Sequence, residues 1–266
     1  MAKINEKKGG LSVLGRLEEE DFGVLRAPLE SGRQAPAALG GVLVLSVFFQ
    51  ALLFALEYFV AGYATVYPYK DEILTVHLWF TGGLIVFSLL YAIPAVYNKS
   101  GRIQYLISIA VSQNLFALPL FISALFLMGR NENGQGVSAE SLLVFTYITL
   151  AIGMLVFIAT SIRFYKLLKK GQYRKGSGKG ELREKFEAKS FIPMATIAGL
   201  GLVFVIQYMA RNSAINDVNI MIVIVMGIGL FFVMLFVLPE QLVILYCKYR
   251  FKSFNFDGRG YLNKQE

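Results

Sequence analysis

Long apolar segments alternate with short polar ones along most of the chain. Six of them are long enough to cross a hydrocarbon core of about 30 Å, which takes about 20 helical residues. They lie at about 38–64, 73–96, 103–128, 141–162, 191–210 and 219–247. None shows the two-residue polar alternation of a transmembrane β-barrel strand, and a backbone in lipid must satisfy its hydrogen bonds internally. The pattern therefore predicts an all-α, polytopic integral membrane protein, a bundle of six transmembrane helices.

Basic residues gather in every second connection between the predicted helices. The connections 1–37, 97–102, 163–190 and 248–266 hold 23 of the 26 Lys and Arg residues. Because connections rich in Lys and Arg stay inside, we expect both termini to be cytoplasmic and the protein to lie in the cytoplasmic (plasma) membrane. The polar start of the chain has no signal-peptide pattern, so the first helix is expected to be retained.

Three polar segments are expected in the cytoplasm: an N-terminal arm (1–37), a basic loop (163–190) and a basic tail (248–266). In the arm, four apolar residues predict a short amphipathic helix that ends in an acidic run: Leu11, Val13, Leu14 and Leu17. This arm could lie on the membrane, dock a partner or remain without fixed structure. Three interpretations of the arm therefore stay open.

Pro239 leaves two interpretations of the sixth apolar segment. It could kink a continuous helix that carries Glu240 as a buried acid. Alternatively, proline suits the first position of a helix and acids suit the first turn, which would make 240–254 a separate interfacial helix.

Composition supports the membrane assignment and narrows the chemistry. Hydrophobic residues make up 56% of the chain, charged residues only 17%, and the mean hydropathy is +0.56. One Cys and one His exclude an internal disulfide, a zinc finger and a multi-histidine metal site. No G-x-S-x-G or complete P-loop motif is present. We therefore expect no catalytic residues, no metal, no cofactor and no enzymatic activity, and the net charge of +8 does not indicate nucleic-acid binding.

Several polar residues lie inside the predicted helices, where a charge at the bilayer centre costs at least about 2.5–3.5 kcal/mol. We predict an intramembrane polar site from Glu57, His77, Gln50, Gln113, Asn114, Gln207 and Glu240. Ser46, Gln50 and Glu57 share one helical stripe. Counting residues from the short loop places Glu57 and His77 at similar depths, so we predict that they pair. The alternative is that His77 faces the lipid headgroups. Gln207 lies at a comparable level. These residues could join helices or form a path for protons or a substrate.

The basic loop supplies a second set of candidates, residues predicted to contact anionic lipids at the cytoplasmic face: Lys166, Lys169, Lys170, Arg174 and Lys175. The expected partners are thus the lipid bilayer and other membrane proteins. We expect a non-enzymatic subunit, accessory or immunity-like partner of a membrane protein complex. The alternative is a small permease or secondary transporter that uses the polar residues inside the bundle.

Overall fold

The computed structural model describes residues 13–63, 65–130, 137–177 and 216–264. Five helical stretches in these ranges are long and apolar enough to cross a membrane: Pro36–Ala61, Lys70–Ala92, Pro94–Met128, Ala139–Lys169 and Ile220–Arg250. The described chain is thus helical and compatible with a multi-pass membrane protein. Five of the six predicted segments correspond to these stretches. The predicted segment 191–210 lies outside the described residues.

The helix boundaries follow local signals in the sequence. Prolines occupy the first position of α2 (Pro36–Leu56) and α4 (Pro94–Phe116), where their fixed φ suits a helix start. Ser138 caps α6 (Ala139–Lys169) by accepting a hydrogen bond from the backbone N–H of Ser141. α3 spans Lys70–Ala92. The starts of α2, α4 and α6 are therefore marked by residues whose chemistry favours a helix start. α3 begins directly after Tyr69, whose backbone is in the left-handed region.

Two prolines inside apolar segments differ in their effect on the helix. Pro119 lies just after the break at Ala117 that separates α4 from α5 (Leu118–Met128). Pro239 lies inside α9 (Asn216–Arg250), which continues past it for eleven residues. The separate interfacial helix at 240–254 is therefore wrong. Within the described tail, the helical structure after α9 is a short 3-10 turn, η4 (Lys252–Phe254).

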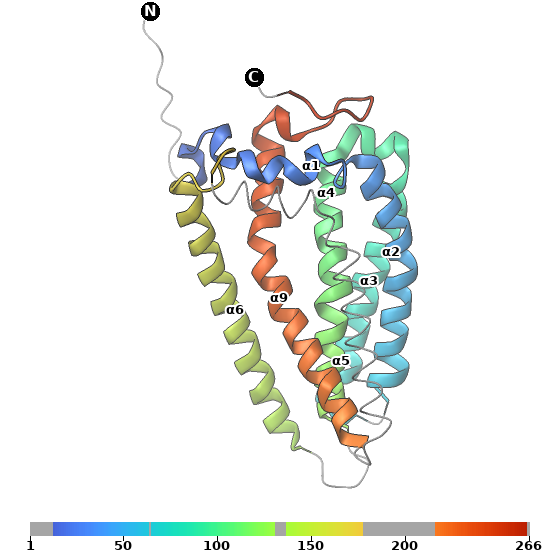
Figure 1. Cartoon of the computed structure of the whole chain (residues 1–266). Helices are drawn as coiled ribbons and strands as arrows, with labels where there is room; N and C mark the ends of the chain where they lie inside the picture. Colours follow the sequence, from blue (N-terminus) through green and yellow to red (C-terminus); the bar gives the residue numbers. More distant parts are fainter. Residues whose placement is uncertain (1–12, 64, 131–136, 178–215, 265–266) are drawn as a thin grey trace, which may run out of the picture.

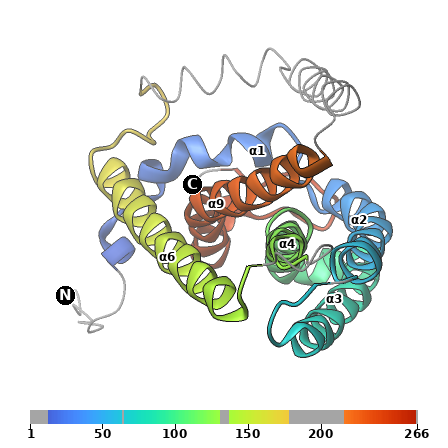
Figure 2. The same ribbon diagram turned by 90° about the horizontal axis from the view of Figure 1, so that it is seen from below.

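The helices form two groups. α2, α3 and α4 pack against one another, whereas α5 and α6 both pack against α9 (Figures 1 and 2). α4 also contacts α9 and so connects the groups. Figure 1 shows α6 ending at the same end of the bundle at which α9 ends, while α9 begins at the opposite end.

Three polar segments meet at one end of the bundle, and we call the assembly of 13–30, 164–177 and 247–264 the cap. Its apolar core joins Phe22 and Leu25 of the arm to Leu168 of α6 and Phe254 of the tail. Both described chain ends lie there (Figure 1). The described parts of the three segments predicted to share the cytoplasm therefore lie at one end of the bundle.

The arm differs from the predicted amphipathic helix. It consists of 3-10 turns at Val13–Arg16 (η1) and Glu19–Arg26 (η2), and then the single turn α1 (Ala27–Glu30). Gly15, Gly23 and Pro28 interrupt any longer α-helix, because both residue types disfavour helix interiors. The described part of the arm is thus neither without structure nor a regular amphipathic helix, and it packs on the chain's own α6 and tail.

Two acidic residues of the arm bind the basic loop. Asp21 Oδ1 accepts a hydrogen bond from Arg174 Nε at 2.7 Å, and Glu30 Oε1 accepts one from Lys175 Nζ at 2.7 Å. The hydrogen bond and charge of Asp21 raise the pKa of the Arg174 guanidinium. Arg174 and Lys175, predicted as lipid contacts, thus have carboxylate partners within the protein.

Candidate functional site

Two stripes of polar residues face each other across α2 and α3. Each stripe spans eleven residues, with intervals of four and seven that keep its members on one helix face. Because the two helices run antiparallel, the stripes stay opposite each other along their length (Figure 1). None of the six residues is more than 4% exposed: Ser46 and Gln50 on α2 with Glu57 directly after it, and His77, Thr81 and Ser88 on α3.

Glu57 and His77 are in direct contact. His77 Nδ1 lies 2.9 Å from Glu57 Oε1 and 2.8 Å from Oε2, and the Glu57 side chain is fully buried. Glu57 begins η3 (Glu57–Ala61), a π-helical turn in which the N–H of Gly62 bonds to the Glu57 carbonyl at 2.8 Å. Single π-helical turns are rare in proteins overall, and those that occur are often found at functional sites. The predicted proximity of these two residues is thus present, in a locally altered helix.

Asn114 of α4 links the two stripes. Its Oδ1 lies 3.0 Å from His77 Nε2 and accepts a hydrogen bond from Thr81 Oγ1 at 3.3 Å. Its Nδ2 donates to Gln50 Oε1 at 3.1 Å. The Asn114 amide therefore bonds to side chains of both α2 and α3. The residue is only 1% exposed.

The direction of the hydrogen bonds follows from one backbone carbonyl. The Leu43 carbonyl can only accept, so the Ser46 hydroxyl, 2.7 Å away, donates to it. Gln50 Nε2 then donates to Ser46 Oγ at 3.3 Å, which turns Gln50 Oε1 toward the Asn114 Nδ2 donor.

This direction fixes the protonation of one imidazole nitrogen. With its Nδ2 donating to Gln50, Asn114 presents Oδ1 to His77, and this oxygen can only accept. His77 Nε2 therefore carries a hydrogen. The remaining proton of the site lies between His77 Nδ1 and the Glu57 carboxyl, so the pair is neutral overall whichever atom holds it.

A pocket of about 390 Å³ lies beside His77, between α3 and α5. Apart from His77 and Glu72, its lining is apolar, with Phe80 of α3 and Leu118 of α5 among its residues. Glu72 is in the first turn of α3, at the end of the bundle opposite the cap. The pocket therefore lies beside the half of α3 that is farther from the cap.

The other predicted members of the polar site lie elsewhere. Gln113 precedes Asn114 but is only half-buried, and its Nε2 has no hydrogen-bond partner among the described residues. Glu240 is half-buried on α9 and belongs to no bond of this network. Gln207 lies outside the described residues. Lys166, Lys169 and Lys170 are exposed at the cap end of α6.

Two members of the network, Thr81 and Ser88, are missing from the sequence-predicted set. Their positions in the sequence could have indicated them, because they follow His77 by four and eleven residues and so lie on the same helix face. Hydroxyl groups are common in membrane helices, where they bond to their own backbone. Without the opposite stripe of α2 as a guide, they do not stand out.

No metal centre is formed in the part of the chain that the structure describes, where no three His, Cys, Asp or Glu residues are grouped closely enough to hold an ion. Comparisons with protein-family models, with curated protein sequences and with solved structures find no match. The case for function consequently depends on the geometry of the buried network.

Proposed function

We propose that this chain is a small proton-coupled secondary transporter, in which the Glu57–His77 pair binds and releases a proton. The observation that carries the proposal is the continuous hydrogen-bonded row from Glu57 through His77, Asn114 and Gln50 to Ser46. A carboxyl and an imidazole in contact exchange protons near neutral pH. Ionisable residues inside membrane helices are rare, and they mark substrate paths and proton relays.

Release of the shared proton would change the whole row. A carboxylate would then face the lone pair of His77 Nδ1, and this repulsion favours moving the ring hydrogen from Nε2 to Nδ1. His77 Nε2 becomes an acceptor, so the amide of Asn114 turns to donate to it. Gln50 must turn as well and accept from Ser46 or Ser88. One proton is thereby coupled to the orientation of two amides on two helices.

The row extends from Glu57 toward the cap end of the bundle. From Glu57 to Ser46 it covers eleven residues of the chain, or about 16 Å at 1.5 Å per residue, about half of a hydrocarbon core. A structural hydrogen bond between two helices does not need a row of this length, and the length supports a proton path.

The single histidine allows a direct test of the protonation state. Full-length protein labelled with 15N-histidine in nanodiscs gives imidazole signals from His77 alone. We expect nuclear magnetic resonance to show a hydrogen fixed on Nε2. Asn114→Leu should mix the two ring tautomers, whereas the neighbouring Gln113→Leu should leave the spectrum unchanged. A bare Nε2 in the wild-type protein would contradict the proposed direction of the row.

Transport itself is tested in liposomes. We expect the purified protein to carry protons inward when a potassium diffusion potential drives them, as measured by a pH-sensitive dye trapped inside. Glu57→Gln should abolish this flux, because the amide cannot release a proton. The matched control is Glu240→Gln, which alters another acid of the apolar segments outside the network. No flux, or equal flux in Glu57→Gln, would overturn the proposal.

We further propose that the cap faces the cytoplasm and that the chain crosses a plasma membrane six times. The basic residues of the arm, the loop and the tail support this orientation, and these segments meet at one end of the bundle. Reporter fusions that are active only outside should be silent at Lys170 and Gly260 and active at Gln135. Activity at Gly260 would contradict an even number of crossings.

A role as a subunit or partner of a membrane complex stays a prediction with less support. It rested on a mixed-charge arm, a basic loop and a basic tail that were all expected at the cytoplasmic face, and two acids of the arm now have partners in the loop. Stoichiometric co-purification of tagged protein with other membrane proteins, together with no flux in liposomes, would favour that role.

A further inference from the structure

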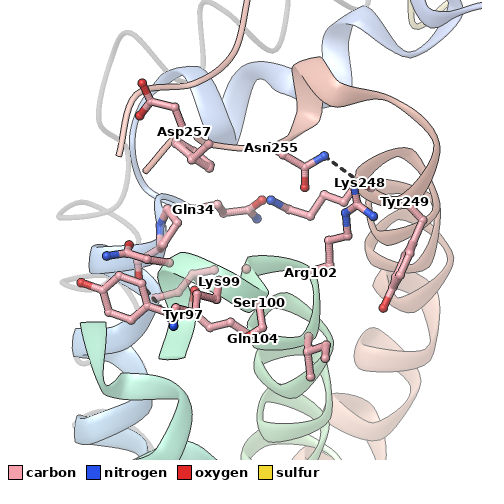
Figure 3. Close-up of a pocket in the computed structure, with 16 residues that line it drawn as sticks. Gln34, Tyr97, Lys99, Ser100, Arg102, Gln104, Lys248, Tyr249, Asn255 and Asp257 are labelled. Carbon is pink, nitrogen blue, oxygen red and sulfur yellow. Dashed lines mark hydrogen bonds between the residues drawn. The ribbon is translucent and has the colours of Figure 1, made fainter. Parts of the chain in front are cut away.

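A second pocket, of about 380 Å³, lies at the cap end of the bundle (Figure 3), and His77 is not among the residues that line it. It lies between the first turns of α2 and α4, the last turn of α9 and the tail. α4 leaves helical geometry at Ser100, with φ −136° and ψ 39°, and this break lines the pocket. The pocket is thus at the level where the helices would leave the membrane.

Basic side chains dominate the pocket. Lys248 and Arg102 line it from α9 and α4, and Lys99 adds a third positive charge. Its one acidic residue, Asp257, uses Oδ1 to accept the backbone N–H groups of Arg259 and Tyr261, both at 2.9 Å. That carboxylate therefore serves a turn of the tail.

Lys248 is the unusual member, because it is only 3% exposed. Its Nζ donates to the Phe254 carbonyl at 3.2 Å and lies 5.1 Å from the ring centre of Tyr105 and 5.4 Å from that of Phe256. No carboxylate of the described residues forms an ion pair with it. A buried ammonium group without a counter-ion is costly, so an anion in the pocket would stabilise it.

Arg102 is exposed and similarly has no acidic partner among the residues described. Its guanidinium lies over the ring of Tyr249, with 5.5 Å from Cζ to the ring centre. Figure 3 shows Arg102 and Lys248 projecting into the same space. A planar guanidinium and an ammonium group together suit a phosphate, which accepts hydrogen bonds from both.

Two buried amide oxygens complete the recognition chemistry. Gln104 donates from Nε2 to the carbonyls of Pro36 and Tyr91 at 2.9 and 3.0 Å, which fixes its amide and leaves Oε1 without a partner among the described residues. Gln34 Oε1 is buried, and in the same part of the chain it too has no partner. These oxygens can only accept, so a ligand that satisfies them carries hydrogen-bond donors such as hydroxyl groups.

We propose that this pocket binds a phosphate ester that carries hydroxyl groups on its alcohol portion, as phosphoglycerol does. The phosphate contacts Lys248 and Arg102, and the hydroxyl groups donate to Gln104 and Gln34. Such a group occurs in the headgroup of an anionic phospholipid and in free glycerol phosphate. Basic pockets between membrane helices bind lipid headgroups in this way.

Two binding measurements on the full-length protein distinguish these sources. In nanodiscs of phosphatidylcholine, isothermal titration calorimetry measures binding of free glycerol phosphate. In nanodiscs that also contain phosphatidylglycerol, native mass spectrometry measures how much of that lipid stays with the released protein. Binding in the first measurement identifies a soluble ester as sufficient, and binding in the second alone identifies the lipid.

Variants connect the binding to the pocket. Arg102→Gln should weaken it by at least about tenfold, because a charge-assisted hydrogen bond is lost from an exposed side chain without disturbing the core. Lys248→Gln should weaken it at least as much, with circular dichroism to check the fold. Arg163→Gln removes an exposed cation near the cap end of α6, and it should have no effect on binding. Absence of binding to both probes, or an equal loss in the Arg163 variant, would overturn the proposal.

Discussion

The α2–α3–α4 group and the α5–α9 pair lie next to each other, yet their contacts differ in kind. Within the first, Asn114 joins side chains of three helices through hydrogen bonds. Within the second, Phe121 and Phe231 stack with 4.4 Å between ring centres, and Gly227 lets α9 approach the α5 backbone. Lipid gives no hydrophobic force between helices, so both interfaces depend on other terms.

The difference concerns what each interface requires of its residues. A polar network requires that every donor and acceptor keeps a partner, and replacing one member leaves the others unsatisfied. An apolar interface requires matching shape, and an added methyl group is enough to separate two backbones. Substitutions should therefore have their largest effects through shape in α5–α9 and through lost partners in α2–α4.

The largest loss of stability is expected for Gly227→Ala. A Cβ at this position would lie 2.5 Å from the Leu120 carbonyl oxygen, which is backbone and cannot rotate away. We expect the free energy of unfolding to fall by about 3 kcal/mol, the upper part of the range for overpacking. Unfolding in dodecyl sulfate, followed by circular dichroism, measures it. Gly229→Ala, with no atom within 4 Å of its added Cβ, should be neutral or stabilising by up to about 1 kcal/mol.

Asn114→Leu should have the next largest effect. It leaves His77 Nε2 and Gln50 Oε1 without their partner, at an expected cost of about 1–2 kcal/mol in the same unfolding assay. Gln113→Leu is the control, since its Nε2 already lacks a partner among the described residues. Equal losses in the two variants would mean that the network contributes nothing specific to stability.

Phe121→Leu should be milder. The substitution removes the ring that stacks on Phe231 but keeps an apolar side chain, so we expect a loss of about 1 kcal/mol. Phe116→Leu removes a ring that is 50% exposed and should change stability by less than about 0.5 kcal/mol. A larger effect at Phe116 would show that shape matters at surfaces outside the α5–α9 interface.

The smallest effect is expected for Ser88→Ala. Its hydroxyl lies 3.4 Å from Gln50 Nε2, which keeps a second acceptor in Ser46 Oγ at 3.3 Å. The loss should stay below about 0.5 kcal/mol, as for Ser108→Ala, whose hydroxyl bonds to its own helix. A loss well above that of the Ser108 variant would assign Ser88 a larger part in orienting Gln50.

The apolar segments of the sequence were sufficient to predict five of the described helices, because length and hydropathy alone identify such helices. The contact between Glu57 and His77 was also predictable, since a short loop fixes their depths. The π-helical turn at Glu57 was not, because it depends on how the buried carboxyl fits against a neighbouring helix. The central position of Asn114 likewise depends on which face of α4 meets the other two helices.

The cap was least predictable. The sequence of the arm shows mixed charges and a few apolar residues, a pattern that fits a membrane surface or a partner equally well. Its actual contacts, such as Asp21 with Arg174 and Arg26 with the Asn263 carbonyl at 3.1 Å, join residues 153 and 237 positions apart. Local patterns contain no information on contacts at such separations. The pocket with Lys248 and Arg102 likewise combines residues that lie far apart in the sequence, and it was missed for the same reason.

The pairing of Glu57 with His77 has a consequence for how the chain is made. The two residues are only 20 positions apart, on consecutive helices that emerge from the ribosome one after the other. α2 alone would enter the lipid with an unpaired carboxyl group, and α3 alone with an unpaired imidazole. As a hairpin they enter as a neutral pair, which lipid tolerates better than either group alone. The first two helices therefore form the smallest unit suited to insertion, and Asn114 joins them only when the third arrives.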